Sequence, residues 1–153
     1  RNKPANTLIH MLCNAVSRGG NFLLNVAPGP DGDWDDSAYY RLKEIGRWMK
    51  VNSEAIYGTT FIKPYKEGKF VFTKKNDAVY AIYLADETET QMPERIVINS
   101  FQRTATTKIY LLGYNKPLAF KRPDANGMEV IIPAKLRNDL PGKHAWVFKI
   151  TDH

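Results

Sequence analysis

The segment GGNFLLNVAPGPDGDW, residues 19–34, decides the fold expected for this chain. Gly19 and Gly20 accept the left-handed backbone that ends helices, and the apolar run from Phe22 to Val26 lacks the polar alternation of a half-exposed strand. Such a run is typical of a strand buried on both faces of a parallel sheet. Residues 27–32 contain two prolines and two glycines, which interrupt helices and strands alike, so they predict a loop.

An amphipathic helix is predicted on each side of this segment. The first starts at Asn6 or Thr7, either of which is expected to cap it, and ends at the two glycines. Its apolar residues, at spacings of three and four, are Leu8, Ile9, Leu12, Cys13 and Val16. The second starts with Asp35 and Asp36, which suit the helix dipole, and ends near Asn52. Its apolar stripe is Ala38, Leu42, Ile45 and Met49, with Trp48 beside it as a core residue.

After Tyr57 the pattern changes to short segments rich in Val, Ile, Tyr and Phe, separated by turn residues. The predicted strands are 69–74, 79–84, 95–98, 108–112, 128–132 and 145–150. Six to eight such strands in about 96 residues are typical of an antiparallel β-sandwich that forms its own unit.

One buried parallel strand between two helices leaves its ladder groups and both apolar faces without neighbours, so the other strands are expected to lie elsewhere. The order helix, strand, loop, helix is that of the last turn of a (β/α)8 barrel. We therefore expect an α/β unit over residues 1–57, the last helix-strand-helix of such a barrel. An all-β unit, the antiparallel β-sandwich, is expected over residues 58–153.

The composition of the chain argues against some classes of partner and of covalent link. Lys and Arg exceed Asp and Glu by 22 to 16, but the basic residues of the β-region alternate with strand formers, as in Lys63, Lys66 and Lys69. This pattern predicts a solvated sheet face with edge protection, and no nucleic-acid partner. No apolar run approaches the roughly 20 residues of a membrane span. The single Cys13 excludes an internal disulfide.

Two runs, VSRGGNFLLNVAPGPDGDW at 16–34 and LKEIGRWMKVNSEAIYGTTF at 42–61, closely resemble the end of the catalytic barrel in family 29 glycoside hydrolases, the α-L-fucosidases. Several elements recur in order and at fixed spacing over about 45 residues. Residues 62–153 resemble the family's C-terminal β-sandwich in length and pattern. The sequence departs from the family at Ala27, where glycine is usual, and at Asp33-Trp34, where Thr-Ile is common.

The resemblance implies a retaining enzyme that cleaves terminal α-L-fucose from glycans or oligosaccharides through two carboxylates roughly 5 to 5.5 Å apart. In the family both carboxylates precede the position of Arg1, so no catalytic residue is assigned here, and this chain alone is expected to be inactive. No cofactor is implied. The implied partners are a fucosylated glycan and the N-terminal part of the barrel, and the implied compartment is periplasmic, secreted or lysosomal.

Two residues are candidates for the rim of the site. Asn25 is expected at the C-terminal end of the last barrel strand, where its amide either braces a neighbouring loop or catalytic side chain or closes the strand by a structural hydrogen bond. Trp34 either stacks on a sugar ring beyond the fucose or packs the loop down. For the neighbouring acidic residues, helix capping and loop solvation are favoured over a calcium loop, which lacks glycine at Asp36 and glutamate at Leu42.

Other chemistry has weaker support in the sequence. His10 and Cys13 share a helix face, but no second pair completes a zinc site, so no metal is predicted. The alternative function is a non-catalytic carbohydrate-binding or interaction module built on the β-region. Its candidate platform residues are Tyr65, Phe101 and Tyr114, which are otherwise core or edge residues.

Overall fold

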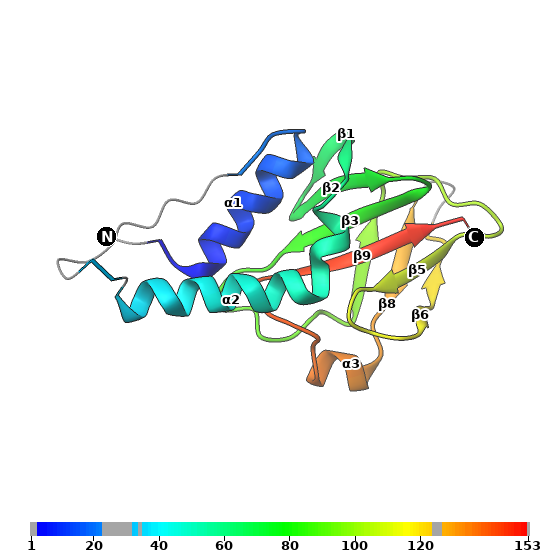
Figure 1. The fold of residues 1–153 in the computed structure, drawn as a ribbon. Coiled ribbons are helices and arrows are strands. Elements are labelled where there is room, and N and C mark those ends of the chain that lie inside the picture. Colours follow the sequence, from blue (N-terminus) through cyan, green and yellow to red (C-terminus); the bar gives the residue numbers. More distant parts are fainter. Residues whose placement is uncertain (1–2, 23–31, 34, 124–126, 153) are drawn as a thin grey trace.

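The computed structural model describes residues 3–22, 32–33, 35–123 and 127–152 (Figure 1). Two helices, α1 (Ala5–Ser17) and α2 (Asp36–Asn52), come first, and the 3-10 turn η1 (Ser53–Ala55) follows α2. Both predicted helices are therefore confirmed. The predicted strand between them lies almost wholly outside the described residues. None of the described helices combines the length and apolar character needed to cross a lipid bilayer.

The start of α1 differs from the prediction. Pro4 is the N-cap and no side chain caps the helix, whereas Asn6 lies one residue inside it. The predicted cap at Asn6 or Thr7 is wrong, because the Asn6 amide donates instead to the carbonyl oxygen of Ala85, 3.0 Å away. The C-terminal end follows the prediction. Gly19 has φ +79°, and its N–H donates to the carbonyl of Val16.

The rest of the chain forms nine strands and one short helix, α3, among the described residues. Their bounds are β1 (Thr60–Glu67), β2 (Phe70–Lys75), β3 (Ala78–Leu84), β4 (Arg95–Ile98), β5 (Lys108–Leu111), β6 (Pro117–Leu118), β7 (Phe120–Lys121), β8 (Met128–Ile131), α3 (Ala134–Asn138) and β9 (Ala145–Thr151). Six of the strands match the predicted segments to within one residue at each end, and β1, β6, β7 and α3 are additional.

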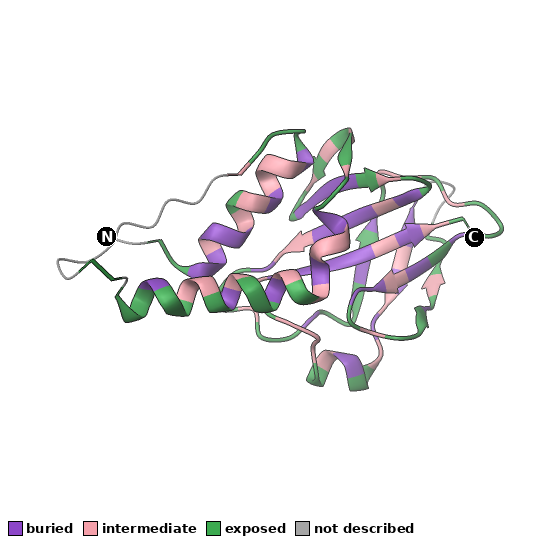
Figure 2. Ribbon diagram, in the orientation of Figure 1, coloured by how far each residue is buried: buried purple, intermediate pink, exposed green. Residues whose placement is uncertain are grey.

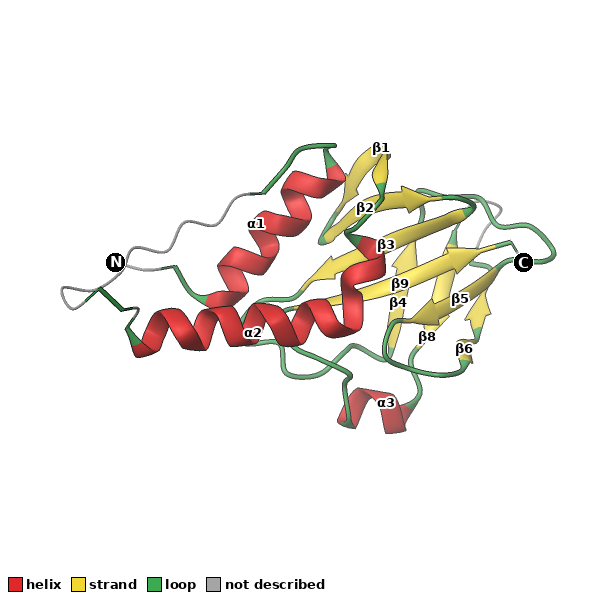
Figure 3. Ribbon diagram, in the orientation of Figure 1, coloured by secondary structure: helices red, strands yellow, loops and turns green. Residues whose placement is uncertain are grey.

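These strands form two antiparallel sheets (Figure 3). The large sheet has the order β1-β2-β3-β9-β5-β6, and the small sheet has the order β4-β8-β7. Strand β9 pairs with β3 on one side and β5 on the other, so it lies inside the large sheet although it follows both in the chain. The predicted antiparallel β-sandwich is confirmed.

One hydrophobic core lies between the two sheets. From the large sheet, Phe72 and Phe148 are fully buried, and from the small sheet Ile98 and Val130 are fully buried. Aromatic rings contact each other across this layer, as in the edge-to-face pair of Phe72 and Phe101, whose centroids are 4.8 Å apart. This core closes the sandwich.

A second core lies on the opposite face of the large sheet, under the helices. Val71, Tyr80 and Val147 alternate with the residues of the first core along their strands and pack against Ile9 and Trp48 of the helices. Figure 2 shows buried residues on both the helices and the large sheet. Helices and sandwich therefore share a hydrophobic core, which fixes the position of α1 and α2.

Candidate functional site

The two predicted rim residues, Asn25 and Trp34, lie outside the described residues. The acidic residues beside them are described at Asp33 and Asp35. The Asp35 carboxylate accepts hydrogen bonds from the Ala38 N–H at 2.7 Å and the Ser37 hydroxyl at 2.8 Å, so it is the N-cap of α2. The hydrogen bond from Ser37, with that from Ala38, lowers the pKa of Asp35. The prediction of a capping role is confirmed for this residue.

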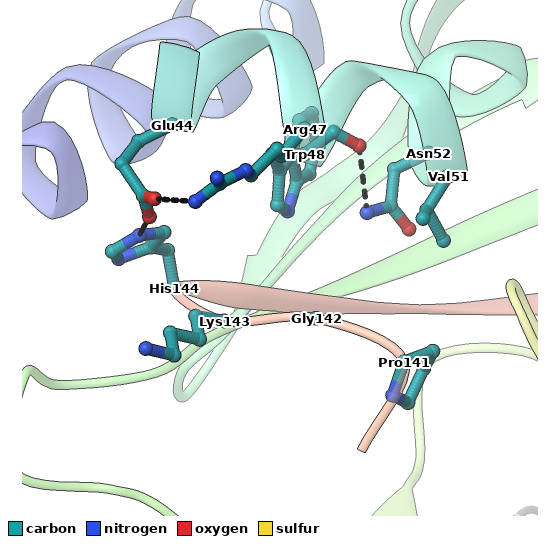
Figure 4. Close-up of a pocket in the computed structure, with 9 residues that line it drawn as sticks. All are labelled: Glu44, Arg47, Trp48, Val51, Asn52, Pro141, Gly142, Lys143 and His144. Atoms are coloured by element: carbon teal, nitrogen blue, oxygen red, sulfur yellow. Dashed lines mark hydrogen bonds and ion pairs between the residues drawn. The ribbon is translucent and has the colours of Figure 1, made fainter. Parts of the chain in front are cut away.

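Polar side chains of both helices meet the segment before β9, and we call this cluster the junction. It consists of Asn6 and His10 on α1, Glu44 and Trp48 on α2, and His144 just before β9. Figure 4 shows the part formed by α2 and the segment around His144. The junction is where the N-terminal helices are fixed to the sandwich by directional contacts as well as by the shared core.

Glu44 joins α2 to His144. The residue is 8% exposed, and its Oε2 lies 3.1 Å from His144 Nε2. The other oxygen, Oε1, accepts a hydrogen bond from Arg47 at 2.9 Å. The hydrogen bond to His144 is the main cause that lowers the pKa of Glu44, with a further contribution from Arg47. Both carboxylate oxygens are thus engaged, so Glu44 is a positioning group rather than a free base.

The two α1 residues secure the other side of the junction. His10 Nε2 lies 2.8 Å from the backbone carbonyl of His144. Because a carbonyl only accepts, His10 carries a proton on Nε2. The Ala85 N–H donates to the same carbonyl at 3.0 Å, and the Ala85 carbonyl accepts from Asn6. His144 itself has φ +79°, an uncommon backbone for a residue with a side chain, and this geometry is held by contacts from both helices.

Trp48 completes the junction from α2. It is 3% exposed, and its indole N–H donates to the carbonyl of Ala145 at 3.0 Å. The prediction that Trp48 is a core residue is confirmed. The hydrogen bond also fixes the orientation of the indole, because a buried tryptophan N–H needs an acceptor and the Ala145 carbonyl of β9 provides it.

A small cavity lies between α2 and the segment 141–144 (Figure 4). Its volume is about 230 Å³, below the roughly 300 to 1,000 Å³ of typical ligand pockets. It is lined by Glu44, Arg47, Trp48, Val51, Asn52, Pro141, Gly142, Lys143 and His144. Since Glu44, Trp48 and His144 already use their polar atoms on one another or on the backbone, this cavity belongs to the structural junction.

Cys13 and His10, which share a face of α1, have separate surroundings. Cys13 is fully buried in the second core, and burial raises the pKa of its thiol, which makes it a poor nucleophile at neutral pH. His10 instead contacts the His144 carbonyl. Over the described ranges, no three His, Cys, Asp or Glu side chains are grouped so that they could hold a metal ion.

The three aromatic residues considered as a binding platform separate in the structure. Phe101 and Tyr114 are half-buried and pack against the core between the sheets, so they are core residues. Tyr65 lines an open pocket beside the end of α1. Tyr114 also borders an open pocket, on the α3 side, so of the three only Tyr65 lines a pocket without packing against the core between the sheets.

The junction was not found from the sequence, although part of its signal was present. Glu44, Trp48 and Asn52 follow one another at a spacing of four, which places a carboxylate and an amide on the same helix face as a core tryptophan. That combination indicates buried polar contacts. The partner, His144, is 100 residues from Glu44, and no local pattern links the two.

Two family models match this chain. One is described as "Alpha-L-fucosidase" and matches residues 1–54, and the other is described as "Alpha-L-fucosidase C-terminal domain" and matches residues 64–151.

Relatives and solved structures agree with these matches. The "Alpha-L-fucosidase" of Branchiostoma floridae is 34% identical, over 94% of this chain and 32% of that protein. The "Tissue alpha-L-fucosidase" of Bos taurus is 36% identical, over 95% of this chain and 31% of that protein. The crystal structure of Thermotoga maritima α-fucosidase with a mechanism-based inhibitor superposes with a TM-score of 0.81 at 28% identity, over 97% of this chain and 34% of that chain.

The chain therefore spans about a third of the length of the proteins it matches. The C-terminal domain model alone, over residues 64–151, accounts for more than half of the 153 residues. On this basis the chain belongs to the α-L-fucosidase family.

Proposed function

We propose that this chain is the C-terminal part of a retaining α-L-fucosidase, which hydrolyses terminal α-L-fucosyl linkages of glycans. The observation that carries the proposal is the order of the two family matches, barrel end at 1–54 and C-terminal domain at 64–151. The superposition on a fucosidase that was crystallised with fucose, with a TM-score of 0.79, supports the same assignment. The catalytic carboxylates lie upstream of this chain in this proposal.

The proposed contribution of the chain is to close the barrel. Residues 1–57 supply its last helix, strand and helix, and residues 58–153 form a sandwich that holds them in place through the shared core and the junction. Exposed apolar side chains on the helices support the proposal that another part of the protein packs against them. Met11, Tyr39 and Tyr40 are 37%, 48% and 61% exposed. The N-terminal part of the barrel is the proposed partner that covers them.

The rim residues complete the proposal. Asn25 braces the loops at the C-terminal end of the last strand, and Trp34 stacks on the sugar that follows the fucose. A stacking role predicts that Trp34 contributes to the binding of an oligosaccharide or an aryl fucoside, both of which place a ring after the fucose, and contributes little to that of α-L-fucosyl fluoride, which has no such ring.

The test compares the complete protein, the chain alone, and the chain combined with the N-terminal part of the barrel. Release of L-fucose from an aryl α-L-fucoside is expected from the complete protein and from the combination, and none from the chain alone. Trp34→Ala is expected to raise KM for a fucosylated oligosaccharide and to leave KM for α-L-fucosyl fluoride unaffected. Tyr57→Ala, which removes an aromatic ring that is 68% exposed, is the control. A complete protein that releases no fucose from any of these substrates contradicts the proposal.

A further inference from the structure

A pocket of about 400 Å³ lies between the C-terminal end of α1 and the edge strand β1. It is lined by Arg18, Phe61, Pro64, Tyr65 and Lys66, and we call it the bulge pocket. Figure 1 shows the end of α1 beside β1, at the edge of the large sheet. The volume lies within the range of small-molecule sites, and none of the junction residues takes part in it.

An irregularity in the pairing of β1 forms one wall of this pocket. Between Phe61 and Lys66 the strand advances five residues, while its partner β2 advances only two, from Thr73 to Val71. The extra residues form a bulge that carries Pro64 and Tyr65 out of the regular ladder. Tyr65 has φ +71°, in the left-handed region that residues with a side chain rarely adopt. Bulges that re-aim a side chain, and strained residues, concentrate at functional sites.

Phe61 forms the facing wall and is held in place by the end of α1. A β-carbon added at Gly19 would lie 3.2 Å from Cδ1 of Phe61, so the ring packs directly on the glycine backbone. The ring centroids of Phe61 and Tyr65 are 5.9 Å apart, and the two ring planes are inclined at 42°. Phe61 nevertheless remains 53% exposed. A large apolar ring that is positioned and yet open to solvent offers a surface for a flat ligand face.

The charged side chains that line the pocket are both cationic. Arg18 and Lys66 line it, and no acidic residue is among its described lining. By contrast, the nearby Lys69 pairs with Asp86 and Glu89, and Lys75 donates to the Glu54 and Tyr57 carbonyls. Two cations beside the exposed ring of Phe61 and the half-buried ring of Tyr65 are complementary to an anion that carries an apolar ring face.

We propose that the bulge pocket binds an acidic sugar, a pyranose that bears a sulfate or a carboxylate. The C–H face of the pyranose lies on Phe61 and Tyr65, and the anionic group pairs with Arg18 and Lys66. The choice of a sugar among ring-shaped anions rests on the proposed function, since a fucosidase meets glycans. The binding itself involves no fucose and no catalytic carboxylate.

The experiment is an NMR titration of the full 153-residue chain with N-acetylglucosamine 6-sulfate and with glucuronic acid, each against its neutral parent, N-acetylglucosamine or glucose. We expect the aromatic resonances of Phe61 and Tyr65 to shift with an acidic sugar and not with the neutral parents. Comparing the dissociation constants of the two acidic sugars shows whether the pocket prefers a sulfate or a carboxylate. The dissociation constant is expected to rise with added salt, because exposed ion pairs are screened.

Variants distinguish binding in the bulge pocket from nonspecific electrostatic attraction of an anion to a basic protein. Lys66→Gln is expected to weaken binding by about fivefold, the upper range for an exposed ion pair. Lys116→Gln, a change at an exposed lysine outside the pocket, is expected to leave it unchanged. Phe61→Ala is expected to abolish the shift of the Tyr65 resonances, and Tyr57→Ala is its matched control. Thermal unfolding checks that each variant is folded.

Three outcomes overturn the proposal. The first is equal binding of the acidic sugars and their neutral parents, and the second is equal binding of an acidic sugar by Lys66→Gln and by the unaltered chain. The third is binding by the chain that disappears in the complete protein, since the pocket is then a contact with the barrel. Fucose release is measured separately, so loss of sugar binding in an active enzyme overturns this inference without touching the proposed function.

Discussion

Gly113, in the turn after β5, lies where α2 and the segment before β9 come together. A β-carbon at this position would be 2.5 Å from Cβ of Pro141 and 2.9 Å from Cγ1 of Val51. The backbone also has φ +91°. Space and conformation therefore both require glycine here.

Gly113→Ala is expected to destabilise the chain by roughly 2 to 4 kcal/mol, from overpacking and from the left-handed backbone together. Urea unfolding measures the change. The matched control is Gly46→Ala in α2, where a β-carbon meets nothing within 4 Å and the helix gains about 1 kcal/mol from alanine. A Gly113→Ala variant as stable as the parent chain would show that Pro141 and Val51 can move apart without cost.

Single residues differ in how far their roles follow from the sequence. The sequence predicts that Trp48 is a core residue, because a large aromatic beside an apolar helical stripe is seldom anywhere else. For Asn6 the sequence predicts a cap, with Thr7 as the alternative, because the local pattern allows one and the actual partner, the Ala85 carbonyl, is 79 residues away. Local chemistry predicts local roles, and contacts between distant segments override it.

Helices and strands were predicted more reliably than their side-chain contacts. The strands β2, β3, β4, β5, β8 and β9 lie between clear turn residues, and their Val, Ile and aromatic content needs no tertiary information. The sequence does not predict strand β1, because Pro64 and three lysines break the apolar pattern of 60–69. Its bulge explains how a proline is accommodated at a sheet edge. The rim residues of the candidate site remain predictions.

The attachment of α2 to the sandwich is expected to depend on pH through Glu44. Its pKa is lowered from 4.5 in the folded chain, so the carboxylate adds stability above the unfolded-state value, and this is lost as the pH falls through the folded value. Glu44→Gln is therefore expected to destabilise the chain by about 1 kcal/mol at pH 6 to 7. The difference from the parent should shrink below about pH 4.

Urea unfolding of both proteins between pH 3 and pH 7 measures this dependence. Glu87→Gln, at an exposed glutamate, is the control and should shift neither the stability nor its pH profile. A Glu44→Gln deficit that is the same at pH 3 and pH 7 would show that the charge of Glu44 has no part in the junction.

In the whole molecule, the large sheet lies between the two hydrophobic cores, one shared with the small sheet and one shared with the helices. Val71, Tyr80, Ile82 and Val147 of the large sheet are at most 1% exposed, and the helices cover them. Burying four such side chains contributes about 6 to 12 kcal/mol, which is comparable to the entire stability of a typical domain. Removing residues 1–57 is thus expected to abolish stable folding of the sandwich.

Circular dichroism melting and binding of a hydrophobic dye test this expectation on residues 58–153. The truncated chain should bind the dye and lack a cooperative transition. Changing Val71 and Ile82 to threonine in the truncated chain should reduce dye binding, because these side chains face the removed helices. A cooperative transition of the unaltered truncated sandwich, equal to that of the full chain, would contradict the shared core.

The position of β9 inside the large sheet has a consequence for synthesis in the cell. Strands β3 and β5 leave the ribosome well before residue 151, and each presents a bare hydrogen-bonding edge until β9 slots between them. Until β9 is synthesised, the unpaired edges of β3 and β5 are open to aggregation, and chaperones protect such intermediates. A chain whose translation stops shortly before β9 therefore lacks the strand that joins β3 to β5 in the large sheet.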